Sequence, residues 1–401
     1  MDMILSQAST LLNGVVSQMT GQTNPAAITN VDQFVSVADS VLKTGLDPVI
    51  NAISQIWRRT IFADRAYDNP LSSLRMSESR WGNATRKLSP IADDMEDDAG
   101  LKYPVAYDST QTDPYGNGQS VDMYAINKQK AFQTNFYGSS VYQQHYTIFK
   151  DQFDVAFSSP EEFVRFNSMC LTERNNDRAS FEEAKARLLQ ANMIASVLDE
   201  NNAERVINLL TEYNTLTGQS LTATSVMQAG NFEAFTRWMY SRIRTLIGLM
   251  RSRSNMFQTV VTGKNILRHT SPENVRVALY APFMEMIQTM VMSGLYHNDL
   301  MQLPTYESID FWQSIKNPQA INIVPTYMGT NGQPKTAAAA VTDSTVIGVI
   351  HDRDALGYAM LNAESSVTPY NSRGRYWNDF YNARCSTLFD NSEKIIVLKL
   401  A

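Results

Sequence analysis

Apolar residues recur at helical spacing in several long segments of the chain, most densely between residues 160 and 254. Ser159 followed by Pro160 has the composition of a helix start, and Ser180 with Glu183 has that of a capping box. Because a capping box marks an N-terminus, we expect a separate helix from Ser180. The expected helices begin at Asn30, Pro160, Ser180, Asn202 and Asn231.

Apolar and polar residues alternate with the period of a strand on both sides of the turn-forming residues 113–118. Residues 101–107 and 121–125 are therefore expected to form a long hairpin, which is marginally stable unless it lies on other protein. Residues 329–341 are expected to be an exposed loop. Later in the chain, strands are expected at 275–279, 320–324, 345–350 and 393–400, with a methionine-rich helix from Pro282. The mixture predicts an α+β fold.

Composition and charge exclude several classes of protein. Of the 401 residues, 43% are hydrophobic and 18% charged, which excludes disorder of the whole chain. The net charge of −6 argues against a protein that reads nucleic-acid sequence. The two cysteines, Cys170 and Cys385, lie far apart, which favours folding in a reducing compartment. No cation precedes Lys43 and no apolar run reaches bilayer length, so we expect a soluble protein that is not exported and does not bind membranes.

Candidate chemistry is sparse. Gly263-Lys264 lacks the remainder of a phosphate loop and is expected to be a turn, and no histidine has zinc-ligand spacing. His351, Asp352 and Asp354 could serve a metal-dependent hydrolase, which is one alternative function. They follow an apolar strand, however, where polar residues usually leave the sheet for solvent. We therefore predict no catalytic, cofactor-binding or metal-binding residues and no enzymatic activity.

Two charged clusters have open interpretations. The acidic residues between 93 and 98 lack the glycine of a calcium loop and are expected to be solvated or to contact arginines of another subunit. The basic cluster on the expected helix from Asn231 suits either phosphate neutralisation or pairing with neighbouring acids. Its members are Arg237, Arg242, Arg244, Arg251 and Arg253.

Three segments give the chain a family resemblance. The order of an arm, a long hairpin, a long helix and a terminal α/β lobe resembles that of the major capsid proteins of tailed phages. The segments that carry this resemblance are residues 135–166, 271–287 and 344–360. They resemble the passage from hairpin to helical domain, a strand-to-helix opening, and a late strand and turn. The chain is thus similar to proteins of the Hong Kong 97 fold, and most similar to the head proteins of small podophages.

The resemblance implies a structural role in assembly. The family forms pentamers and hexamers that close an icosahedral shell around double-stranded DNA, with scaffolding and portal proteins as partners and assembly in the host cytoplasm. Lys102, Lys128 and Lys130 lie in the loop region, but no motif identifies a covalent crosslink. An encapsulin-like shell is the second alternative function. The implied regions are an arm (1–70), an extended loop (71–145), a peripheral domain with a spine helix (146–255), an axial domain (256–370) and a strand returning to the peripheral domain (371–401).

Overall fold

The structure is a computed structural model that divides into two compact units. Unit 1 comprises residues 1–84, 137–190 and 356–388, and unit 2 comprises residues 85–136, 191–355 and 389–401. Both contain helices and strands, which confirms the expected α+β class. The residues described are 8–10, 12–17, 28, 31–43, 67–76, 84–92, 124, 126, 128–137, 139–151, 160–290 and 306–401.

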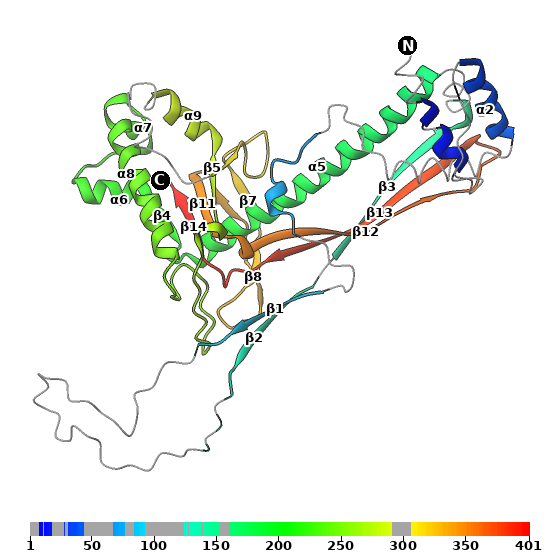
Figure 1. Ribbon diagram of the computed structural model, residues 1–401. Helices are drawn as coiled ribbons and strands as arrows, with labels where there is room; N and C mark the ends of the chain where they lie inside the picture. The colour runs from blue at the N-terminus through cyan, green and yellow to red at the C-terminus, as the bar shows by residue number, and fades with distance from the viewer. Residues whose placement is uncertain are drawn as a thin grey trace, which may run out of the picture. The chain divides into compact units, whose positions relative to one another are not determined.

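Unit 1 contains a three-stranded sheet beside a long helix, α5 (Figure 1). The strand order is β12-β13-β3, and β13 runs antiparallel to β3 with Tyr376 opposite Phe149. The periodicity of the sequence did not predict β12 or β13, although the family resemblance implied a strand within residues 371–401. The element bounds are β3 (Ser139–Phe149), α5 (Pro160–Glu200), β12 (Leu356–Val367) and β13 (Tyr376–Phe389).

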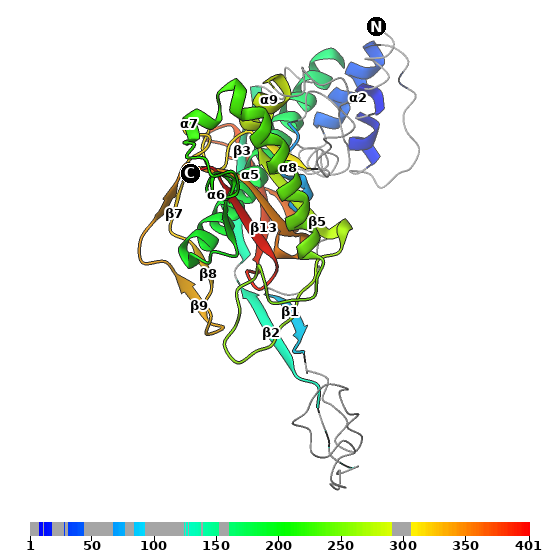
Figure 2. The same cartoon turned by 90° about the vertical axis from the view of Figure 1, so that its left-hand side faces the viewer.

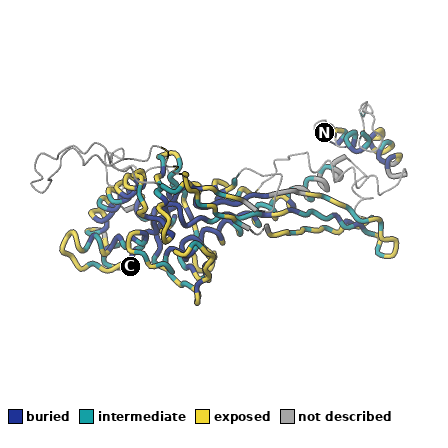
Figure 3. The backbone as a smooth tube through the Cα atoms, turned by 90° about the horizontal axis from the view of Figure 1, so that it is seen from below, coloured by how far each residue is buried: buried dark blue, intermediate teal, exposed yellow. Residues whose placement is uncertain are grey.

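Side chains of β3 alternate between the helix-facing side of this sheet and its outer side. The ring of Tyr142 stacks on Phe181 of α5 at 4.3 Å, whereas Val141 and Phe149 on the outer side are exposed. Along β3 exposed residues alternate with intermediate ones between Val141 and Thr147, and Figure 3 colours the backbone by this burial. Within unit 1, one face of the sheet is therefore packed and the other is open.

The expectation of a separate helix from Ser180 is wrong. α5 is continuous from Pro160 to Glu200, and Ser180 is an exposed residue in its middle. The carboxylate of Glu183 accepts from the Arg187 guanidinium at 2.6 Å, one turn further along, and so does not close a capping box. Ion pairs between residues four apart stabilise a helix interior. Ser180 and Glu183 therefore lie within α5 and do not begin a new helix.

The amino-terminal residues of unit 1 are more helical than expected. The helix from Asn30 is confirmed as α2 (Val31–Lys43), with Phe34, Ala38 and Val41 buried along one side. Residues 8–10 and 12–17 are also helical, which their composition did not indicate. A short 3-10 helix, η1 (Ser72–Leu74), precedes the backbone bond from Met76 N to Tyr358 O in β12.

Unit 2 contains a five-stranded sheet in the order β4-β14-β11-β5-β6. The central strand β11 is antiparallel to both neighbours and buried along its whole length, whereas β4 and β6 pair in parallel at the edges. The strands are β4 (Val206–Asn208), β5 (Val275–Tyr280), β6 (Glu307–Ile309), β11 (Val346–Asp352) and β14 (Ile395–Lys399). The expected strands within 275–279, 345–350 and 393–400 are thereby confirmed.

Helices gather beside this sheet and share its core (Figure 2). The apolar stripe expected on the helix from Asn231 is confirmed on α8, where Phe235 and Ile243 are fully buried. The helical run expected from Asn202 is wrong in its first part, because residues 206–208 pair with β14 and the helix starts only after them. The helices are α6 (Leu209–Thr217), α7 (Ala223–Val226), α8 (Ala229–Met250) and α9 (Ala281–Met290).

Short strand pairs complete unit 2. Part of the expected exposed loop at 329–341 is instead a hairpin of β8 and β9, whose turn requires Gly332 at φ 73°. β1 and β2 also pair, and the Ile91 amide donates to Lys130 O beyond them. The hairpin strands expected at 101–107 and 121–125 lie outside the described residues. The short strands are β1 (Ala84–Pro90), β2 (Ala131–Tyr137), β7 (Ile321–Ile323), β8 (Thr326–Met328), β9 (Pro334–Thr336) and β10 (Val341–Asp343), with 3-10 helices η2 (Pro272–Asn274) and η5 (Arg353–Ala355).

None of the helices in the described part of the chain combines the length and the hydropathy of a transmembrane segment.

The continuity of α5 is testable at Ser180. We expect Ser180→Ala to leave the free energy of unfolding unchanged or raised by a few tenths of a kcal/mol, because Ala is the better residue in a helix interior. Asn208→Ala is the matched control, since the Asn208 side chain accepts from Thr211 N at the start of α6. Its loss should cost about 1 kcal/mol or more in urea unfolding of the full chain. A loss of about 1 kcal/mol in Ser180→Ala would instead indicate a capped helix start.

Candidate functional site

Five consecutive polar residues, 390–394, are buried in unit 2. They are Asp390, Asn391, Ser392, Glu393 and Lys394, and none is more than 5% exposed. We call them the polar segment. They connect the end of β13 to the start of β14, where a chain connection would ordinarily lie in solvent. Each of these side chains therefore needs a partner inside the protein.

The acids of the polar segment share one cation from β1. The Lys87 ammonium lies 2.8 Å from Asp390 Oδ2 and 2.6 Å from Glu393 Oε1. Burial alone would lower the pKa of Lys87, but the two carboxylates raise it above its ordinary value. Burial likewise works against the charge of Asp390, yet Lys87 and the Ser392 hydroxyl hold its pKa below the ordinary value. Lys87 therefore remains charged and neutralises the segment.

Arg268 provides a second cation for the same segment. Its guanidinium lies 3.3 Å from Glu393 Oε1 and donates to the hydroxyls of Ser89 in β1 and Ser392. Even so, burial raises the pKa of Glu393, and Lys87 and Arg268 offset only part of that effect. Glu393 is thus the carboxyl in this cluster that takes up a proton most readily.

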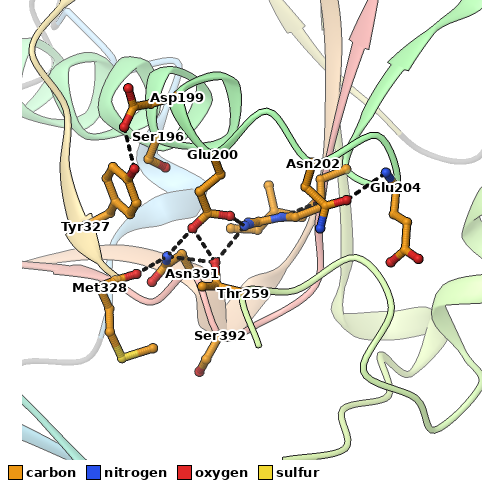
Figure 4. Close-up of polar contacts among 12 residues, drawn as sticks. Ser196, Asp199, Glu200, Asn202, Glu204, Thr259, Tyr327, Met328, Asn391 and Ser392 are labelled. Atoms are coloured by element: carbon orange, nitrogen blue, oxygen red, sulfur yellow. Dashed lines mark hydrogen bonds and ion pairs between the residues drawn. The ribbon is translucent and has the colours of Figure 1, made fainter. Parts of the chain in front are cut away.

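Asn391 connects the segment to the end of α5 (Figure 4). Its amide nitrogen donates to Met328 O at 2.7 Å, to the Thr259 hydroxyl at 2.8 Å and to Glu200 at 3.0 Å. The Thr259 hydroxyl donates in turn to Glu200 and accepts from Arg205. Arg205 is fully buried, and although its ion pair with Glu200 favours the charge, burial lowers its pKa. Because these residues come from separate segments of unit 2, the network fixes the end of α5, the start of β14 and the β8–β9 hairpin relative to one another.

A neighbouring triad ties the β8–β9 hairpin to the same helix end. The Tyr327 hydroxyl donates to Asp199 (Figure 4). The Lys335 ammonium reaches Tyr327 Oη at 2.7 Å and Asp199 Oδ2 at 3.1 Å. The pKa of Asp199 is lowered chiefly by the Tyr327 hydrogen bond, with Lys335 adding to it.

Lys394 is the cation of the polar segment, and it is buried. No carboxylate among the described residues is hydrogen bonded to it. Its ammonium donates to Ser252 O at 2.8 Å and Ser254 Oγ at 3.0 Å, and it lies 5.9 Å from the centre of the Phe257 ring. Burial lowers its pKa to about 8. Phe257 itself has a φ of 65°, which a bulky side chain rarely adopts, and its carbonyl accepts from Ile395 N at the start of β14.

The histidine and acids proposed for hydrolysis do not form a site. We expected His351 and Asp352 to leave the strand for solvent, but both lie inside β11 and are buried, because this strand is the centre of the sheet. His351 Nδ1 is 2.8 Å from Asp352 O, and burial lowers the pKa of His351. Asp354 is exposed on η5. Among the described residues, no group of three His, Cys, Asp or Glu side chains could hold a metal ion.

The remaining candidates have simple structural positions. Gly263 lies in a turn with φ 73°, as expected, and both cysteines are free thiols. Two of the clustered arginines pair with acids, since Arg237 lies 2.5 Å from Glu233 and Arg242 lies 2.7 Å from Glu212. The acidic residues between 93 and 98, and Lys102, lie outside the described residues.

Among the described residues, the polar segment and its partners hold the fold of unit 2 together. Sequence reasoning missed the polar segment, because Glu393 and Lys394 were assigned to a strand and the residues before them were not considered. The sequence does show five polar residues directly before an apolar run. Their structural role follows only from their burial, which the sequence does not show.

Comparison with known proteins places this geometry in context. The family model described as Phi29-like phage major capsid protein matches residues 12–398. A chain of the capsid structure of Staphylococcus phage Andhra is similar with a TM-score of 0.51 and 11% identity, covering 86% of this chain and 87% of that chain. A chain from the structure of the head fiber and inner core protein gp22 of native bacteriophage P68 gives a TM-score of 0.51 and 9% identity, covering 85% and 87%. At these identities the likeness concerns the fold alone. The search of curated proteins found no match.

Lys87 is the first test of the polar segment. We expect Lys87→Met to lower the free energy of unfolding by about 3 kcal/mol, because Asp390 and Glu393 lose their shared cation. The deficit should shrink as the pH falls from about 7 to about 5, since a buried carboxylate without a cation takes up a proton. Lys130→Met, at an exposed position just before β2, should change stability by less than about 0.5 kcal/mol. Equal effects of the two substitutions in urea unfolding would contradict this role.

Lys394 predicts a distinct pH dependence. Its folded pKa of about 8 lies below the unfolded value of about 10.4. Between these values the folded chain binds fewer protons than the unfolded chain, so stability rises with pH. We therefore expect the unfolding free energy of the wild type, relative to Lys394→Met, to increase from about pH 8 to about pH 10. A difference that stays constant over this range would show that Lys394 titrates normally.

Proposed function

The chain belongs to the Phi29-like phage major capsid protein family, and from this membership we propose that copies of it assemble into pentamers and hexamers of an icosahedral shell around double-stranded DNA. The observation that carries the proposal is the family match over residues 12–398. As a major capsid protein, the chain is a structural component of the virion capsid. The family assignment favours this function over an encapsulin-like shell and over a hydrolase using His351, Asp352 and Asp354.

Exposed apolar side chains give independent physical support for assembly. Val141 on the outer side of the β3 sheet is 66% exposed, and Ile126 and Ile315 in unit 2 are 83% and 76% exposed. Covering an exposed apolar side chain with another molecule is favourable, because apolar surface is removed from water. In a shell, neighbouring copies would provide that cover.

The proposed regions follow the family resemblance. They are the arm at 1–70, the extended loop at 71–145, the peripheral domain at 146–255, the axial domain at 256–370 and the returning strand at 371–401. The paired strands β1 and β2 support an extended loop, because they close the segment between them at its base. Scaffolding and portal proteins are the further partners proposed, and the host cytoplasm is the proposed place of assembly.

Assembly itself is the experiment that tests the proposal. We expect the wild-type chain, co-expressed with its scaffolding protein, to form closed particles that sediment fast and are visible by electron microscopy. A variant with residues 104–124 replaced by a short Gly-Ser linker should keep near-native circular dichroism but form no closed particles. The physical reason is that a long hairpin contributes little to an isolated subunit and much to a contact between subunits.

The control is the melting of the unassembled wild type and variant, which should differ little. Wild-type-like particles from the variant would contradict the interlocking role of this segment, and an unfolded variant would place it in the subunit core. A wild type that stays monomeric with its scaffold present, at every salt concentration, would contradict the proposed function as a whole.

A further inference from the structure

One stretch of unit 2 has a charge opposite to that of the chain. Residues 234–272 contain seven Lys and Arg and no Asp or Glu, although the chain has 40 acids and a net charge of −6. The stretch covers most of α8 and the connection that follows it. Its cations are Arg237, Arg242, Arg244, Arg251, Arg253, Lys264 and Arg268.

Three of these arginines lie on one exposed side of α8. Arg237, Arg244 and Arg251 are seven residues apart, which is close to two helical turns or about 10 Å. All three are exposed, and the opposite side of α8 carries the buried apolar stripe. We call these three residues the arginine row. Arg253, two residues beyond the row, is also exposed.

Two of the other three cations of the stretch have strong partners in the subunit. Arg242 makes a bidentate pair with Glu212 at 2.7 and 2.8 Å, and Arg268 pairs with Glu393. In the row, Arg237 has an ion pair with Glu233, but both side chains are half exposed and such pairs are weak. Arg251 and Arg253 take part in none of the ion pairs between described residues. Their charges are available to a partner.

A helix-terminus effect explains only part of the pattern. Cations near a C-terminus are stabilised by the helix dipole, which accounts for Arg251 and Arg253. The dipole effect is confined to the last turn and does not reach Arg237 or Arg244. The row extends over four turns, which fits a linear array of negative charges.

The side chains between the arginines indicate which polyanion fits. Ala234, Ser241, Thr245 and Gly248 are the small exposed residues of this side, and Leu249 is the large apolar residue exposed on α8. Protein interfaces depend on aromatic and large apolar anchors, whereas phosphate contacts need only accessible cations and polar groups. A surface of small residues also lets a phosphate backbone approach closely.

The connection after α8 keeps its end in place. Ser254 and Arg268 exchange backbone hydrogen bonds at 2.9 and 3.0 Å, and Thr270 N donates to Met250 O at 3.0 Å. These bonds place the exposed His269 in the segment that pairs with residues 250–254.

We propose that the arginine row and Arg253 bind the phosphate backbone of duplex DNA without reading its sequence, so that this side of α8 faces the lumen. The inference rests on the proposed function, because it names the surface of the shell subunit that contacts the packaged DNA. Acidic charge elsewhere in the chain keeps the remaining surface from holding the DNA tightly.

Binding of a random duplex of about 30 base pairs to the unassembled full-length chain tests the proposal. We expect Arg244→Gln, Arg251→Gln and Arg253→Gln together to weaken binding roughly 100-fold at 0.1 M salt. The slope of log K against log salt should fall by about 2–3, since three phosphate contacts are lost. Lys316→Gln, Arg353→Gln and Arg373→Gln together form the matched control, because they remove equal charge at exposed positions elsewhere.

Each outcome separates one explanation. If both triple variants weaken DNA binding equally, the net charge of the chain explains the loss and the proposal is overturned. Loss of particle formation with unchanged DNA binding would also overturn it, by assigning the row to a contact with an acidic surface of a second copy. Particles that form normally but retain less DNA would support it. Row-dependent DNA binding in a wild type that forms no shells would leave this inference standing and contradict only the proposed function.

Discussion

Unit 2 depends on finding partners for five polar side chains that are buried in succession. A buried donor or acceptor left unpaired costs about 1–3 kcal/mol, and a charge costs more, so the polar segment has to be matched group by group. Lys87 from β1, Arg268 after α8 and Glu200 at the end of α5 provide the matches. Elements distant in sequence are thus fixed by the directional needs of one short connection.

The apolar core acts alongside this network without replacing it. Hydrophobic burial is non-directional, so the packing of α8 and α9 on the sheet stabilises unit 2 without specifying where β1 or the β8–β9 hairpin must lie. Hydrogen bonds to Asn391 and Glu393 do specify it. In a shell protein this division is useful, because copies that pack in an ordered lattice need subunits of one defined shape.

Unit 1 solves a different problem. Its sheet packs one face on α5 and leaves the other open, with Val141 and Phe149 exposed. Arg251 and Arg253 of unit 2 are likewise exposed, and neither takes part in an ion pair between described residues. Exposed apolar surface is suited to contacts with further copies of the chain. Exposed cationic surface is suited to contact with a polyanion, and a capsid protein needs both.

The sequence by itself determined the features that depend on neighbouring residues. The helix from Asn30, the start at Pro160, the stripe of α8 and the apolar strands within 275–279 and 345–350 follow from local periodicity and capping. The capsid resemblance, drawn from three segments, agreed with the family that the whole chain matches. Periodicity depends only on residues near one another in the chain, so helices and strands can be inferred from it without knowing which segments pack together.

Only the tertiary structure decided what depends on distant partners. Ser180 with Glu183 has the composition of a helix start, but Glu183 pairs with Arg187 inside α5. Residues 206–208 continue a helical pattern, yet pairing with β14 makes them a strand. His351 and Asp352 have the polarity of a surface turn, but the position of β11 between two strands buries them. Whether residues 390–394 are surface or core is set by Lys87, Arg268 and Glu200, which lie far away in the chain, because the free energy of burying a charge depends on its neighbours in space.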